Sequence, residues 1–271
     1  MKIFKSKHKL KEEISNMKNI SFVPTMGGLH RGHISLIKKS QLFKGKTLVS
    51  IFVNPRQFNE KKDFFNYPRN LKNDLKILKH LNVDLIYLPT TKDIFSFRVQ
   101  NKIFLDKFSK KLCGKTRKGH FKGVINIVNR FLELIKPKYI LLGIKDFQQS
   151  YLITKHILKR KIDTKVINCK TIREKNGIPC STRNNHLNKK QLKIASNVVK
   201  YLKNKKKLIN KKLSNFKLID LEKDLINLGV TKIDYIELYN LYTLKKPLNK
   251  REKFKIFIAF YLNKTRLIDN I

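Results

Sequence analysis

Short apolar runs alternate along much of this chain with longer segments in which apolar positions recur every three or four residues. The runs are rich in β-branched residues and predict strands at 20–25, 46–53, 83–89, 138–144 and 165–172. The longer segments predict helices at 32–43, 69–81, 121–135 and 146–160. This alternation is typical of an α/β fold with a doubly wound, parallel, Rossmann-like sheet.

The pattern changes after Asn176. A lysine-rich helix is expected from Lys189 to about Asn210, then a helix over 220–228 that Gly229 ends, and then strands at 232–240 and 254–262 before a short final TRLIDN segment. We therefore predict two domains: a Rossmann-like domain over 1–176 and a smaller α+β C-terminal domain over 177–271.

The balance of charge is strongly basic, with 62 Lys and Arg against 19 Asp and Glu, a formal net charge of +43. The lysines are spread from end to end, without a basic stripe or an aromatic stacking platform. This distribution favours a compositional bias and a solvated basic surface over a specific nucleic-acid partner, although nonspecific adhesion to polyanions would follow.

The cysteines indicate the compartment. Cys113, Cys169 and Cys180 are odd in number, lack CxxC spacing and occur without a recognisable signal peptide. We expect a reducing, cytoplasmic location with neither a disulfide framework nor a zinc site. The apolar runs are too short to cross a membrane, so no membrane partner is expected.

One stretch concentrates candidate chemistry: VPTMGGLHRGHISL, residues 23–36, passes from a strand through a glycine turn into a helix. Gly27 and Gly28 would let the backbone approach an anion, and free N–H groups at the helix start would point at it. His30 and His33 share the first helical turn and could donate hydrogen bonds to phosphate oxygens, whereas Arg31 between them reads as variable surface.

A lone histidine or glycine pair would be an ordinary structural feature. The joint spacing instead resembles the nucleotide-binding signature of the class I aminoacyl-tRNA synthetase and nucleotidylyltransferase superfamily, which implies attack on the α-phosphate of ATP.

Two further strands end in polar residues expected at the same sheet edge. In SIFVNPRQF and LLGIKDFQQS, the amides of Gln57 and Gln149 suit a small hydroxylated carboxylate, and Lys145 suits phosphate. Asn54 is a further candidate contact to ligand or metal. Asp146 could contact a ligand or cap the following helix. The Ser181-Thr182-Arg183 sequence is either a mobile phosphate clamp or a polar loop.

Taken in order, PTMGGLHRGH, IFVNPRQF, CGKTRKGHFKGV, GIKDFQQ, TIREKNGIPCSTRN and TRLIDN closely resemble the motifs of the pantoate–β-alanine ligase, or pantothenate synthetase, family over essentially the whole chain. The resemblance implies an ATP-dependent condensation of pantoate with β-alanine through a pantoyl adenylate, which releases AMP and pyrophosphate. It also implies a homodimer. Mg²⁺ is expected to accompany ATP, because the sequence shows no metal cage of carboxylates and magnesium usually binds through the phosphates. By this resemblance the first domain would bind ATP and pantoate, and the second would close over the active site.

The resemblance also assigns residues. Gln57 and Gln149 would bind pantoate, His33 would be catalytic as an acid-like or charge-stabilising group, and no protein metal ligand is expected. ATP would be bound by Met26, Gly27, Gly28, Leu29, His30, Arg31, Gly32, His33, Gly143, Ile144, Lys145, Asp146, Ile172, Cys180, Ser181, Thr182 and Arg183.

Several residues depart from the family pattern. Ile144 stands where a glutamate is usual, Thr182 replaces a serine, Lys118 replaces a proline, and the basic Arg56 beside Gln57 could perturb carboxylate binding. Two other functions are consistent with parts of the sequence: a nucleotidylyltransferase making a dinucleotide or CDP-alcohol, and an RNA-binding protein. The two glutamines favour a small carboxylate over a second nucleotide.

Overall fold

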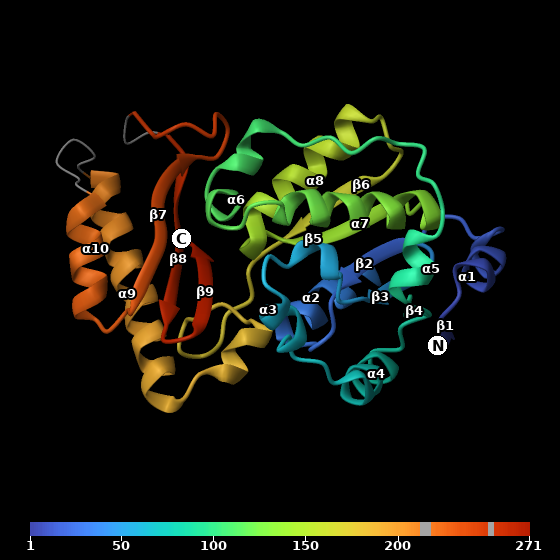
Figure 1. The fold of residues 1–271 in the computed structure, drawn as a ribbon, viewed down its shortest axis with the longest axis horizontal. Coiled ribbons are helices and arrows are strands. Elements are labelled where there is room, and N and C mark those ends of the chain that lie inside the picture. Colours follow the sequence, from blue (N-terminus) through green and yellow to red (C-terminus); the bar gives the residue numbers. More distant parts are fainter. Residues whose placement is uncertain (212–217, 249–251) are drawn as a thin grey trace. The chain divides into compact units, whose positions relative to one another are not determined.

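The computed structural model describes residues 1–211, 218–248 and 252–271 (Figure 1). The chain divides into two compact units, Met1–Thr171 and Ile172–Ile271. This division falls N-terminal to Asn176, the last residue of the first domain expected from the sequence.

A six-stranded parallel sheet forms the centre of the first unit, in the order β1-β4-β3-β2-β5-β6. The strands, in that order, are Lys2–Phe4, Leu85–Tyr87, Thr47–Ile51, Ser21–Thr25, Tyr139–Gly143 and Lys165–Cys169. All five expected strands are present and the doubly wound α/β class is confirmed, whereas the short edge strand β1 was not anticipated.

The helices of this unit include each one expected from the apolar periodicity. They are α1 (Lys7–Ile14), α2 (Arg31–Ser40), α3 (Lys61–Phe65), α4 (Leu71–His80), α5 (Thr91–Phe95), α6 (Cys113–Thr116), α7 (His120–Ile135) and α8 (Phe147–Lys159), with single 3₁₀ turns η1 (Pro55–Gln57), η2 (Lys107–Lys110) and η3 (Ile144–Asp146).

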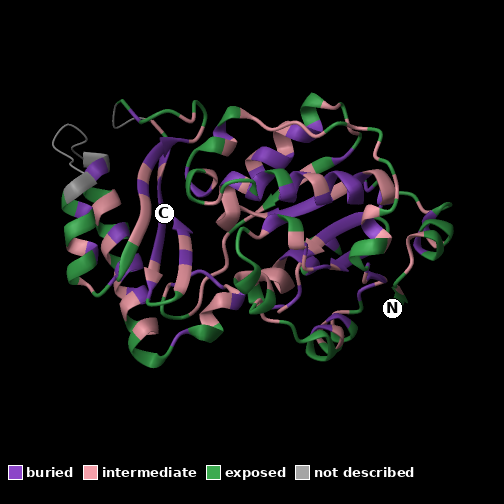
Figure 2. Ribbon diagram, viewed as in Figure 1, coloured by how far each residue is buried: buried purple, intermediate pink, exposed green. Residues whose placement is uncertain are grey.

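Helices cover both faces of the sheet, which explains why its strands are apolar almost throughout (Figure 2). On one face, Val23, Val49 and Ile86 pack with residues of α2 and α4. On the other face, the rings of Phe22 and Tyr87 contact the Phe131 ring of α7 edge to face.

The strand order places three strand ends together. β2 pairs with β3 on one side and with β5 on the other. The other strands that precede β5 in the chain lie on the β3 side of β2, and β5 and β6 lie on its other side, so the strand order reverses at β2. In open parallel sheets, ligands bind beyond the carboxyl ends of the strands at such a reversal of strand order. The residues that follow β2, β3 and β5 therefore occupy the position where a binding site is expected.

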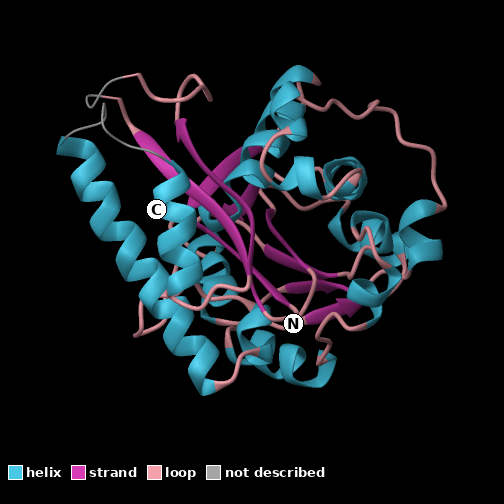
Figure 3. Cartoon of the chain, turned by 60° about the vertical axis from the view of Figure 1, so that its left-hand side comes forward, coloured by secondary structure: helices cyan, strands magenta, loops and turns pink. Residues whose placement is uncertain are grey.

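The second unit is a smaller α+β structure (Figure 3). An antiparallel sheet, β7-β8-β9, comprises Lys232–Asn240, Phe254–Leu262 and Thr265–Asn270. It packs against α9 (Lys189–Lys211) and α10 (Leu218–Asn227), and η4 (Thr182–His186) precedes these helices. The final TRLIDN segment is thus the edge strand β9. None of the helices in the described parts of the chain is long and apolar enough to cross a lipid bilayer.

A buried histidine on α8 predicts how the stability of the fold depends on pH. His156 is fully buried; its Nδ1 accepts a hydrogen bond from the Phe104 N–H at 3.1 Å, and its Nε2 lies 2.9 Å from Asn129 Oδ1. Burial, with a smaller contribution from Arg160, lowers the pKa of His156 from 6.5 to about 4. The unfolded chain therefore takes up the proton first as the pH falls, and stability should be lost between these two pKa values.

His156→Gln isolates this contribution because the variant lacks the titrating ring. Between about pH 7 and pH 5, the wild-type chain should lose about 2 kcal/mol more unfolding free energy than the variant. Urea unfolding at the two pH values measures the difference. Equal losses in both proteins would contradict the assignment.

Candidate active site

The glycine turn after β2 adopts a backbone conformation that favours glycine. Gly27 and Gly28 have φ angles of +81° and +62°, in the left-handed region. A Cβ on Gly27 would also lie 2.9 Å from the carboxylate Oδ2 of Asp74. Both the dihedral angle and the close neighbour therefore explain the first glycine.

Asp74 was not among the residues expected at the site. This carboxylate on α4 is only 1% exposed, and it accepts the N–H of Gly28 at 2.9 Å and the N–H of Leu29 at 2.8 Å. Asp74 therefore occupies the N–H groups of Gly28 and Leu29, so neither of them is available to a phosphate. The sequence feature that could have identified Asp74 is its position four residues before Leu78, which places an acidic residue on the buried face of α4.

His30 and His33 form a reciprocal capping arrangement at the start of α2. His30 is the N-cap residue, and its Nδ1 accepts the Gly32 N–H at 3.1 Å; the Nδ1 of His33 accepts the His30 N–H at 3.3 Å. The two rings stack with centroids 4.0 Å apart. Because each Nδ1 is an acceptor in this network, the neutral rings carry hydrogen on Nε2, which makes Nε2 the donor nitrogen of each ring.

The environment keeps His33 neutral. Burial, then His30 and Lys145, lower its pKa from 6.5 to about 3. A neutral imidazole at physiological pH is a poor proton donor for acid catalysis but a suitable hydrogen-bond donor to developing charge. Of the two roles expected for His33, these contacts therefore favour charge stabilisation.

The turn after β3 is held from several directions. Asn54 is 1% exposed; its Oδ1 accepts the Arg56 N–H at 3.2 Å, and its Nδ2 donates to the Gly123 carbonyl at 3.1 Å and to Gln57 Oε1 at 3.3 Å. Its amide therefore shapes the loop. Gln57 is 8% exposed, and its Nε2 contacts the sulfur of Met26, which joins this turn to the end of β2.

The CGKTRKGHFKGV motif fixes the main chain of Gln57. His120 Nδ1 lies 2.7 Å from the Gln57 carbonyl oxygen, and His120 Nε2 lies 3.1 Å from a guanidinium nitrogen of Arg117. Because a guanidinium group can only donate, Nε2 is the acceptor and Nδ1–H donates to the carbonyl. Nearby Arg56 lies over the Phe95 ring, 3.8 Å from its centroid.

Helix α7 lies so close to the turn after β3 that the effect of a substitution at Gly123 can be predicted. A Cβ on Gly123, in α7, would lie 2.1 Å from the Arg56 carbonyl oxygen and 2.8 Å from the Gln57 Cα. Gly→Ala within a helix is ordinarily stabilising, but here we expect Gly123→Ala to destabilise the fold by about 1–3 kcal/mol through overpacking. The shift should also displace Gln57, which the family resemblance assigns to pantoate, and weaken pantoate binding; unfolding in urea together with pantoate titration measures both effects. A more stable variant with unchanged pantoate affinity would contradict the prediction.

The β5 end supplies Gly143, its last residue, and Ile144, Lys145 and Asp146 of η3, all of them partly exposed. Asp146 occupies the N-cap position of α8 as expected, but its side chain makes no capping hydrogen bond. Lys145 lies close enough to His33 to contribute to the lowering of its pKa. The structure thus brings together the histidine and the lysine that the sequence placed at separate strand ends.

The two adjacent glutamines of α8 have different roles. Gln148 is buried and structural; its Nε2 donates to the carbonyls of Phe108 and Lys111, each at 2.7 Å, and its Oε1 accepts the Cys113 N–H at 3.1 Å. Gln149 is partly exposed, and its amide has no hydrogen-bond partner among the described residues. Gln149 is therefore the glutamine that can bind a ligand.

The remaining candidates belong to the second unit. The Cys180 N–H donates to the Ile172 carbonyl at 2.9 Å, so these two residues face each other across a loop. Ser181 caps η4 by accepting the Arg183 N–H at 3.3 Å. Cys180 and Thr182 are buried, at 2% and 6% exposed, whereas Ser181 and Arg183 are partly exposed.

Comparison with known proteins gives a consistent match. The family model described as pantoate-beta-alanine ligase matches residues 2–271. Pantothenate synthetase from Flavobacterium psychrophilum is 40% identical over 266 residues, covering 97% of this chain and 94% of that protein. The Fervidobacterium nodosum pantothenate synthetase is 39% identical over 265 residues, with 96% and 94% covered.

Solved structures agree. The Thermus thermophilus pantothenate synthetase superposes with a TM-score of 0.90 at 26% identity, covering 100% of this chain and 99% of that chain. The Francisella tularensis pantoate-beta-alanine ligase, complexed with beta-gamma ATP and beta-alanine, superposes with a TM-score of 0.83 at 36% identity and covers 100% and 97%.

Proposed function

We infer the function of this chain from its family, because it belongs to the pantoate-beta-alanine ligases. We propose that it condenses pantoate with β-alanine at the expense of ATP. In the first step the pantoate carboxylate attacks the α-phosphorus of ATP, and pyrophosphate leaves. In the second, the β-alanine amine attacks the acyl carbon of the adenylate, AMP leaves, and the nitrogen loses a proton.

The observation that carries this proposal is the stacked His30–His33 pair at the central strand end, in which His33 is kept neutral close to Lys145. Their Nε2–H groups and the lysine ammonium would stabilise negative charge on the phosphates as pyrophosphate departs. The donors are preorganised because their own Nδ1 atoms are bound to the backbone. His33 is accordingly the proposed catalytic residue.

Substrate binding is assigned as the resemblance implies. We assign pantoate to Gln57, which the surrounding loop holds in place, and to Gln149, whose amide can supply a donor and an acceptor. ATP is assigned to Met26–His33, Gly143–Asp146, Ile172 and Cys180–Arg183. Within the first segment the side chains are the proposed donors, because Asp74 already binds the N–H groups of Gly28 and Leu29.

The substrate nucleotide is proposed to be ATP with Mg²⁺ on its phosphates, since Mg²⁺ commonly reaches such sites with substrate phosphates and few protein ligands. We also propose a homodimer that acts in the cytoplasm, without a specific nucleic-acid partner. Light scattering of the purified chain tests the dimer.

Pantoate-dependent exchange of labelled pyrophosphate into ATP tests the reaction. Exchange is expected with pantoate, ATP and Mg²⁺, in the absence of β-alanine and of RNA. A folded preparation that binds both substrates without exchange would exclude the adenylate route. Exchange with a nucleotide partner in place of pantoate would instead favour a nucleotidylyltransferase.

A further inference from the structure

The loop that carries the ATP-binding candidates of the second unit is a small hairpin. Arg173 forms a β-bridge with Pro179, the Glu174 N–H donates to the Ile178 carbonyl at 2.8 Å, and the Cys180 N–H donates to the Ile172 carbonyl. The two ends of the hairpin are therefore Ile172 and Cys180, and Ser181 to Arg183 follow directly. Any group that fixes the hairpin also fixes these residues.

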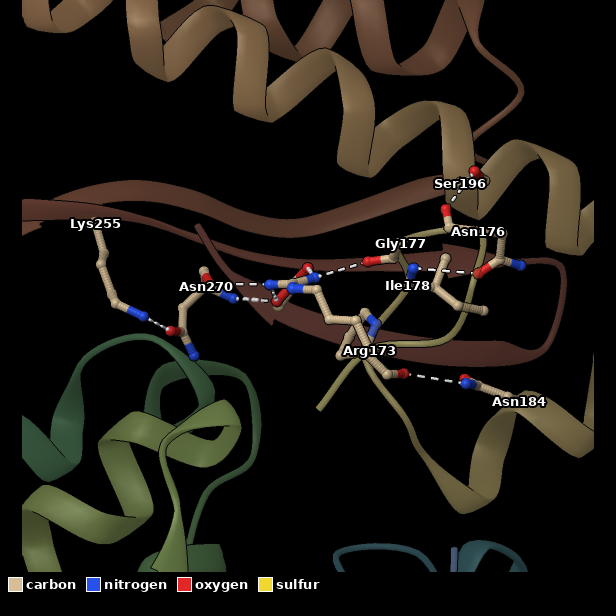
Figure 4. Close-up of polar contacts among 10 residues, drawn as sticks. Arg173, Asn176, Gly177, Ile178, Asn184, Ser196, Lys255 and Asn270 are labelled. Atoms are coloured by element: carbon tan, nitrogen blue, oxygen red, sulfur yellow. Dashed lines mark hydrogen bonds and ion pairs between the residues drawn. The ribbon is translucent and has the colours of Figure 1, made fainter. Parts of the chain in front are cut away.

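Arg173 joins this hairpin to the final strand. One guanidinium nitrogen donates to Asp269 Oδ2 at 2.7 Å and to the Gly177 carbonyl at 3.0 Å (Figure 4). The other nitrogen donates to Asp269 Oδ1 at 2.9 Å. A single side chain thus binds both the tip of its own loop and a carboxylate 96 residues away along the chain.

The carboxylate is held rigidly. Asp269 lies in β9 and pairs with Ile258 of β8, its Oδ1 also accepts the Asn270 N–H at 2.7 Å, and its side chain is only 2% exposed. The planar, two-bond contact with Arg173 restricts both distance and orientation. This pair therefore ties the hairpin to the sheet, and the Ser196 hydroxyl of α9 holds it at a second point by donating to the Asn176 carbonyl at 2.7 Å.

We propose that Asp269 is a positioning residue for ATP: through Arg173 it holds the 172–180 hairpin so that Ile172 and Ser181–Arg183 are aligned to bind the nucleotide. The inference rests on the proposed function of those residues. It assigns a role to the final TRLIDN motif, which the proposed reaction by itself leaves without one.

The same unit supplies a matched control. Arg266 and Asp234 form another ion pair of low exposure, with Nε and Oδ2 2.6 Å apart and side chains 10% and 8% exposed. This pair joins β9 to β7 and does not involve the hairpin. Asp234→Asn therefore breaks a comparable ion pair in the same sheet without releasing Arg173.

The test compares Asp269→Asn with Asp234→Asn in the full chain, using pantoate-dependent ATP–pyrophosphate exchange and thermal unfolding. Asp269→Asn should raise the KM for ATP about tenfold or more and leave the KM for pantoate within about twofold. Asp234→Asn should lower the Tm but leave both KM values within about twofold. Equal effects of the two variants on the KM for ATP, or no effect of Asp269→Asn, would overturn the proposal.

Arg173→Lys is the second variant, because it keeps the charge and loses the paired hydrogen bonds, so the proposal can be tested even if Asp269→Asn does not fold. It too should raise the KM for ATP. Hydrogen exchange of the Glu174, Gly177 and Cys180 amides, which bond within the hairpin, should accelerate in both hairpin variants but not in Asp234→Asn. Unchanged amide exchange and ATP affinity would refute the positioning role, whereas wild-type protein without pantoate-dependent exchange would refute the proposed reaction.

Discussion

Replacing His33 with alanine should slow adenylate formation about a hundred- to a thousandfold, the loss typical of removing one preorganised donor to developing charge. Pantoate affinity should change little, because the proposed pantoate ligands are Gln57 and Gln149. Pantoate-dependent pyrophosphate exchange measures the rate, and titration calorimetry measures the binding. His80→Ala, an exposed histidine at the end of α4, is the control and should exchange at the wild-type rate.

The pH profile adds a second check on His33. Because its pKa is lowered to about 3, it is neutral throughout the physiological range, and exchange should show no inflection from this residue between about pH 5 and 8. An inflection near pH 6.5 that disappears in His33→Ala would show that a charged imidazole takes part. Unchanged exchange in a folded variant would make His33 a structural capping residue.

Replacing Asp74 with asparagine should produce the second large effect. Two backbone N–H groups now bind its carboxylate, and an amide offers one acceptor oxygen and places an N–H₂ group opposite the other donor. Hydrogen bonds to charged groups contribute about 1.5–3 kcal/mol each, so we expect a loss of about 2–3 kcal/mol in unfolding free energy. The glycine turn should shift with it, and a misplacement of about 1 Å can lower the rate about a hundredfold.

Asp84→Asn is the control for this prediction. One Asp84 oxygen accepts the Thr47 N–H at 2.9 Å, at the amino end of β3, and the other pairs with Lys46. This variant should lose some stability and keep its exchange rate per folded molecule. Urea unfolding and pyrophosphate exchange on both variants separate the two effects. Equal rates for Asp74→Asn and wild type would show that Asp74 does not position the turn.

Some parts of the site were readable from the sequence because they are local. The positive φ angles of Gly27 and Gly28 and the contact between His30 and His33 depend on residues at most a few positions apart. The strand–turn–helix order around them follows from apolar periodicity, since buried strands and one-sided helices require different spacings. The chemical character of the turn could therefore be predicted.

Other parts depended on contacts between distant segments. The Gly28 N–H could have bound a phosphate, a water molecule or a carboxylate, and only the packing of α4 against α2 made the partner Asp74. Similarly, the pairing of Arg173 with Asp269 spans 96 residues and follows from the path of β9 beside β8. A local sequence pattern cannot predict such partners, because the residue type of a hydrogen-bonding group does not depend on which group it binds.

The sequence by itself determined the parallel α/β class, the family and the residue types at the strand ends, because periodicity, steric limits and motif spacing are properties of short segments. The tertiary structure decided which polar groups remain available to a ligand. It committed Gln148, Asn54 and two turn N–H groups to internal hydrogen bonds, and it left the Gln149 amide without an internal partner among the described residues. The tertiary structure decides this because a buried polar group needs a hydrogen-bond partner, and the packing of distant segments determines which partner lies within reach.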